Sequence, residues 1–160
     1  MNRKLLLNAI IVLLLAPAWA RPPVSATLSG TTPEGQLVLS QSDQTDLVVD
    51  LAGIDVPPSA RARFSAYCKR VLADRPITVE VVKTSAGGCT AVVKVTVPSG
   101  KKMNLNKQLL VDGYAVLDQS KFSSRLSAYQ AKGKERRVGL WSQDQAHWVV
   151  PRLTGEQAMR

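Results

Sequence analysis

The strongest constraint on the fold of this chain is a series of short β-type segments separated by turn residues. Three such segments precede the Pro57-Pro58 pair, at residues 26–30, 36–41 and 47–55. Turn residues at this spacing are typical of an antiparallel meander of short strands. Proline cannot donate a ladder hydrogen bond, so Pro57 and Pro58 are expected to end the third strand.

One amphipathic helix then interrupts the strands. We expect it over residues 60–74, with Ser59 as its N-cap, because apolar residues such as Phe64 and Val71 recur there at helical spacing. Pro76 prevents the helix from continuing. The helix therefore separates the first three strands from whatever follows.

Two further strands and two helices complete the pattern. β-branched residues favour strands at residues 77–83 and 89–97. The helices are expected to start at Asn104 or Asn106, and at Ser123 or Ser124. Five short antiparallel strands with a helix after the third are the plan of the OB-fold barrel. The predicted fold class is α+β and mostly β: a five-stranded OB-fold barrel with three helices.

Residues 1–20 have the pattern of a secretory signal peptide. Two basic residues precede the apolar run LLLNAIIVLLL, and AWA at positions 18–20 fits the small-x-small cleavage motif. The apolar stretch is shorter than the roughly 20 residues that a membrane-spanning helix needs. We therefore expect an exported protein, periplasmic or secreted, without a membrane span after cleavage. Its domain is placed at residues 21–145 and a C-terminal tail at residues 146–160.

The chain is basic, with 21 Lys and Arg against 12 Asp and Glu, which gives a formal charge of +9. A basic exported protein can meet nucleic acid, anionic lipid headgroups or acidic envelope polymers, although charge also serves solubility. Aromatic residues for base stacking are sparse, which argues against a dedicated single-strand binder. The candidate polyanion-binding residues lie on two helices and one turn: Arg61, Arg63, Lys69 and Arg70; Lys132, Lys134, Arg136 and Arg137; and Lys101 and Lys102.

Cys68 and Cys89 are the two cysteines. An even count in an oxidising compartment favours a disulfide, which the chain-entropy model values at about 3 kcal/mol for this loop. Two buried thiols are the alternative. Zinc is not expected, because His147 is the single histidine and there is no third thiol.

Three stretches resemble the staphylococcal (thermo)nuclease family. LAGID followed by proline is similar to the end of that family's third strand, MNLNKQLLVDGYAVL is similar to its asparagine-led helix and the segment after it, and GLW is similarly placed. The resemblance covers about residues 26–141. It implies calcium-dependent hydrolysis of phosphodiesters, in which carboxylates hold the ion, two arginines grip phosphate oxygens and a glutamate places the water.

The residues at the family's catalytic positions are different here. Asp50 and Cys89 stand where the arginines are expected, and Pro58 stands where the glutamate is expected. Asp55 matches a metal-ligand position and Glu34 lies beside another, so the resemblance implies calcium binding through these two. Asp55 could instead bind backbone amides in its turn. Because the arginine and glutamate set is absent, we expect no catalytic residues and no hydrolysis by the inherited mechanism.

Three functions remain open from the sequence. The first is a non-catalytic module that binds nucleic acid, another polyanion or an envelope protein through its basic surface. The second is a divergent calcium-dependent nuclease. The third is a structural interaction protein of the envelope, in which the barrel is only a platform. Salt-sensitive binding to nucleic acid would distinguish the first from the third.

Overall fold

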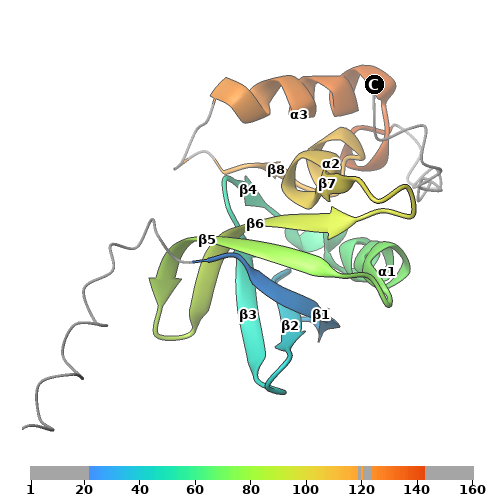
Figure 1. Cartoon of the computed structure of the whole chain (residues 1–160). Coiled ribbons are helices and arrows are strands. Elements are labelled where there is room, and N and C mark those ends of the chain that lie inside the picture. The colour runs from blue at the N-terminus through green and yellow to red at the C-terminus, as the bar shows by residue number, and fades with distance from the viewer. Residues whose placement is uncertain (1–21, 119, 121–123, 143–160) are drawn as a thin grey trace, which may run out of the picture.

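The computed structural model describes residues 22–118, 120 and 124–142, and it has a mostly β body that carries three α-helices (Figure 1). The longer strands are β1 (Val24–Thr31), β2 (Leu37–Gln41), β3 (Asp46–Leu51), β5 (Ile77–Ser85) and β6 (Gly88–Thr96). The short strands are β4 (Ile54–Asp55), β7 (Lys102–Asn104) and β8 (Val116–Leu117). The helices are α1 (Arg61–Leu72), α2 (Leu105–Val111) and α3 (Ser124–Arg136), with 3-10 turns η3 (Pro58–Ala60) and η5 (Gly139–Trp141).

The five longer strands close into a ring. The sheet order is β3-β2-β1-β5-β6, and β3 also pairs with β6 in parallel register, Val49 opposite Cys89. The other neighbours in the ring are antiparallel. β6 is long enough to pair with β3 near its start and with β7 near its end. This arrangement confirms the predicted fold class, mostly β with three helices and consistent with an OB-like fold.

Alternation along the strands builds the core. In β6, Cys89, Ala91, Val93 and Val95 are buried, whereas the residues between them are partly exposed. Such a period of two places every second side chain on the inner face of a sheet. The sequence predicted this strand from its β-branched residues.

The first helix begins later than the sequence suggested. Pro58 opens the 3-10 turn η3, and α1 starts only at Arg61, with no side-chain hydrogen bond at its N-terminus. The prediction that Ser59 caps this helix was therefore wrong, because proline at the start of the turn favours a tight 3-10 geometry that includes Ser59. The buried face of α1 is as expected and includes Phe64 and Val71.

The other two helices stack on one side of the barrel. α2 contacts both β6 and α3, so it lies between the sheet and α3 (Figure 1). Asn104 caps α2 by accepting a hydrogen bond from the Lys107 amide at 3.1 Å. Leu126 and Tyr129 of α3 pack against the core. They therefore form the inward stripe of this helix.

The predicted disulfide is not formed. Cys68 and Cys89 are both free thiols, and both are buried. Cys68 lies in the middle of α1, which packs against β1, whereas Cys89 is held in β6 between Val49 of β3 and Thr84 of β5. The alternative of two buried thiols is what the structure has. The pKa of the Cys68 thiol is raised by its burial.

The predicted signal peptide, the C-terminal tail and His147 lie outside the described residues. Within the described part of the chain, no helix combines the length and apolar character needed to cross a membrane.

Candidate functional site

A pocket of about 620 Å³ opens where β3 leaves the barrel and continues into β4. Its walls come from the β1–β2 turn, the ends of β3 and β4, and the segment after β8. β4 and β8 pair with each other, Asp55 opposite Val116, and this pairing brings residue 118 to the pocket. The pocket therefore lies at the strand end that the sequence singled out.

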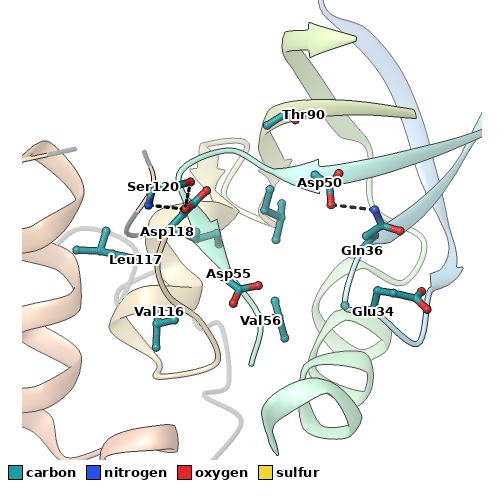
Figure 2. Close-up of a pocket in the computed structure, with 13 residues that line it drawn as sticks. Glu34, Gln36, Asp50, Asp55, Val56, Thr90, Val116, Leu117, Asp118 and Ser120 are labelled. Atoms are coloured by element: carbon teal, nitrogen blue, oxygen red, sulfur yellow. Dashed lines mark hydrogen bonds between the residues drawn. The ribbon is translucent and has the colours of Figure 1, made fainter. Parts of the chain in front are cut away.

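Four carboxylates line this pocket: Glu34, Asp50, Asp55 and Asp118. Figure 2 shows Asp55 between two flanking groups, with Asp50 and Gln36 on one side and Asp118 and Ser120 on the other. Glu34, Asp50 and Asp55 are exposed to solvent. The pocket therefore presents negative charge to any ligand that enters it.

Two of these carboxylates are held by polar neighbours. Asp50 accepts a hydrogen bond from the Gln36 amide at 2.9 Å. Asp118 accepts hydrogen bonds from the backbone amide and the hydroxyl of Ser120, at 2.9 and 2.6 Å. These contacts fix both side chains in the wall of the pocket (Figure 2).

None of the described lining residues is Lys, Arg or His. Arg61 is not a lining residue but contacts two of them, because its Nε donates to the Val56 carbonyl at 3.3 Å and its side chain runs beside Gly35. Pro58 and Cys89 are also outside the lining. Cys89 is buried, and the pKa of its thiol is raised by burial and by the charge of Asp50. A thiol in this setting is a poor nucleophile.

Converging carboxylates raise the question of calcium, which usually takes six to eight oxygen ligands. Within residues 22–118, 120 and 124–142, no three His, Cys, Asp or Glu side chains are grouped in a way that could hold a metal ion. Asp55 and Glu34 line the same pocket but do not belong to such a group. Calcium binding through Asp55 and Glu34 stays a prediction, since backbone carbonyls and water can also supply oxygen ligands to this ion.

The comparison with protein families decides what kind of domain carries this pocket. A family model described as staphylococcal nuclease homologue matches residues 48–143, more than half of the chain. The chain belongs to this family. No curated protein matches it. For a staphylococcal nuclease homologue, an interaction with nucleic acid, through nuclease-like chemistry or through binding, is the expected range of function.

The basic residues of α1 do not form one cluster in this nuclease homologue. A helix turns by about 100° per residue, which separates Arg61 from Arg63 and Arg70. Arg61 lies at the edge of α1 that faces the pocket wall, where its Nε meets Val56. Arg63 and Arg70 flank Tyr67 on the opposite edge, and Lys69 is exposed on the outer face. The structure therefore keeps only Arg63 and Arg70 together.

The basic residues of α3 are divided in a similar way. Arg136 and Lys132 are four residues apart and so share one side of the helix. Lys134 lies on another side, with its Nζ 4.7 Å from the centre of the Trp141 ring. Arg137 follows the helix with a positive φ of 50°. Lys101 and Lys102 are exposed at the start of β7, away from both helices in sequence.

Sequence reasoning missed Gln36 and Asp118 as pocket residues. Gln36 precedes the buried Leu37, so the alternation of β2 predicts that its side chain points outward. The sequence does not reveal that this side chain binds Asp50. Asp118 reaches the pocket only because β8 pairs with β4. Two-residue strands carry too little pattern to reveal such a pairing.

Proposed function

We propose that this staphylococcal nuclease homologue binds nucleic acid without cleaving it. The observation that carries this proposal is the pocket at the end of β3, whose described lining has four carboxylates and no basic side chain. Phosphoryl transfer needs cations around the phosphate, because negative charge gathers on its oxygens in the transition state. The pocket offers the opposite charge.

The size of this effect supports loss of catalysis. Two like unit charges about 4 Å apart repel by about 4 kcal/mol at an effective dielectric constant of about 20. Asp50 occupies the position where the family resemblance places an arginine that attracts phosphate. Replacing this attraction by repulsion changes the interaction energy by about twice 4 kcal/mol. A barrier raised by about 8 kcal/mol slows a reaction by more than five orders of magnitude.

The basic charge supports binding elsewhere on the molecule. Without Arg3 and Lys4 of residues 1–20, the formal charge falls from +9 to +7, and none of the described basic residues lines the acidic pocket. Phosphate contacts of this kind release counterions, and they give sequence-independent, salt-sensitive affinity.

We further propose that the protein acts outside the cytoplasm, in the periplasm or as a secreted protein. The support is the sequence of residues 1–20, which has a basic start, an apolar run and a small-x-small motif. Mass spectrometry of the N-terminus after expression in a secreting host tests this. A mature chain starting at Arg21 is expected, and a retained residue 1–20 segment would contradict it.

A cleavage assay tests the loss of catalysis. The purified full chain is incubated with single-stranded DNA and RNA, with calcium and with chelator, alongside Asp55→Ala. We expect no cleavage above that of a mock preparation in either condition. Calcium-dependent cleavage that Asp55→Ala abolishes would replace this proposal with a divergent nuclease.

A further inference from the structure

The inward edge of α1 carries an arginine on each side of a buried tyrosine. Arg63, Tyr67 and Arg70 are spaced i, i+4 and i+7, so they follow one stripe of the helix. Tyr67 is fully buried, and its hydroxyl donates to Asp112 Oδ2 at 3.1 Å. Arg63 is half-buried and Arg70 is exposed. The stripe therefore leads directly to the C-terminal end of α2, where Asp112 lies.

Asp112 also reaches the end of α3. Its Oδ1 lies 3.7 Å from Nη1 of Arg136, whose side chain is 50% exposed while that of Asp112 is 1% exposed. Gln108 donates a second hydrogen bond to Oδ2 at 2.9 Å. One buried carboxylate thus ties α1, α2 and α3 together, and Arg136 stands at its solvent side.

Tyr114 completes this buried unit. Its ring centre is 4.6 Å from that of Tyr67. Burial raises the pKa of Tyr114 to about 12, while the charges of Arg63 and Arg70 act in the opposite direction. Arg63 and Arg70 lie about one turn before and after Tyr67 on α1, which places both beside this pair of rings. Arg63, Arg70 and Arg136 come from two helices far apart in sequence, and they border the same buried unit.

We propose that Arg63, Arg70 and Arg136 form a site for the phosphates of a nucleic-acid backbone, separate from the acidic pocket. This inference rests on the proposed function and specifies which surface of the protein binds the nucleic acid. Arginine suits this task, since its planar guanidinium can donate two parallel hydrogen bonds to phosphate oxygens. Asp112 pairs with Arg136 at 3.7 Å, but its own side chain is 1% exposed and that of Arg136 is 50% exposed, so the arginine still faces solvent. Lys132 lies one turn before Arg136 on the same side of α3 and extends the positive charge.

The aromatic residues indicate which part of the nucleic acid the site contacts. Tyr67 and Tyr114 are buried in the unit itself. Tyr129 and Trp141 are covered by Lys107 and Lys134, which lie 4.9 and 4.7 Å from the ring centres. Base stacking needs an accessible ring face. Among the described residues, the site therefore offers contacts to phosphate rather than to bases, and binding should be independent of sequence.

Fluorescence anisotropy of a labelled DNA duplex tests the site, measured with the full chain over a range of salt concentrations. The test variant is Arg63→Gln/Arg70→Gln. The matched control is Lys83→Gln/Arg125→Gln, which removes the same charge from exposed positions on β5 and at the start of α3. Each lost phosphate contact should reduce the slope of log affinity against log salt by about 1. We expect a reduction of about 2 in the test variant and almost none in the control.

Further variants distinguish the loss of phosphate contacts from misfolding. Arg63→Lys/Arg70→Lys keeps both charges and should retain most of the slope. Arg136→Gln alone, on a different helix, should reduce it by about 1. Circular dichroism melting shows whether each variant is folded.

The outcomes separate this inference from the proposed function. Absence of wild-type binding at low salt would overturn both. Wild-type binding with equal slopes in the test and control variants would overturn the site and leave the function standing. Sequence preference among duplexes would contradict the phosphate-only contacts. Competition by dextran sulfate at lower charge concentration than unlabelled DNA would replace nucleic acid with a sulfated polymer as the ligand.

Discussion

Asn106 is the buried polar residue that joins the helical layer to the barrel. It is 2% exposed, its Oδ1 accepts from the Val93 amide at 3.0 Å, and its Nδ2 donates to the carbonyls of Ala52 and Ala91 at 3.0 and 3.2 Å. These backbone groups lie on β6 and just after β3. A single amide therefore fixes the strand end that forms the pocket.

Replacing Asn106 by Ala should destabilise the protein much more than replacing its neighbour Asn104. Asn106→Ala leaves three buried backbone groups without this partner, and a loss of about 3 kcal/mol is expected. Asn104→Ala removes one N-cap hydrogen bond, for which about 1 kcal/mol is usual. Chemical denaturation of both variants measures the difference. Equal losses would contradict the structural role assigned to Asn106.

Asp112 should make stability depend on pH. Burial raises the pKa of this carboxyl, although hydrogen bonds from Gln108 and Tyr67 and the charge of Arg136 act against that shift. The folded state therefore binds the proton more tightly than the unfolded state. The contribution of this group is fully present below the unfolded pKa, near its ordinary value of 3.8, and is lost as pH rises through the folded pKa.

Asp112→Asn measures this contribution, because its side chain does not titrate. The unfolding free energy of the wild type minus that of the variant should decrease as pH rises from below 3.8 through the raised pKa. Denaturation series across this range provide the values. A difference that grows with pH would mean that the ion pair with Arg136 outweighs burial.

At the scale of elements, the sequence predicted the long strands but not the pairing between the two-residue strands. β5 and β6 are nine residues long and rich in β-branched residues, so their positions followed from the sequence. β4 and β8 have two residues each, and their pairing depends on contacts distant in the chain. Asp118 was missed for this reason. The disulfide was predicted wrongly, since cysteine count and compartment contain no information about distance.

The packing of α3 on α2 depends on a glycine inside α3. A Cβ at position 133 would overlap the carbonyl oxygen of Leu110. Alanine normally favours a helix over glycine by about 1 kcal/mol. Gly133→Ala should nevertheless destabilise the protein, because the two helices would have to move apart. Ala131→Gly, at an exposed position in the same helix, should cost only about 1 kcal/mol. Thermal denaturation compares them, and a stabilised Gly133→Ala protein would contradict the close contact.

At the scale of the whole molecule, negative and positive side chains lie on different surfaces. The pocket at the end of β3 is acidic, whereas Arg63 and Arg70 of α1 and Arg136 of α3 border the buried unit around Asp112. The fold belongs to the staphylococcal nuclease homologue family over residues 48–143. Its sequence pattern predicted this family, but the separation of Arg61 from Arg63 and Arg70 required the orientation of α1. In our account, the fold has been retained while the chemistry of the pocket has changed.

Electrophoresis of one nucleic-acid sample under native and denaturing conditions tests this account most directly. The full chain is mixed with a labelled duplex and calcium at low salt, and the same mixture is run on both gels. We predict a retarded band on the native gel and full-length strands on the denaturing gel. Shortened strands that depend on calcium would contradict the account, because they would show that the pocket still cleaves phosphodiesters.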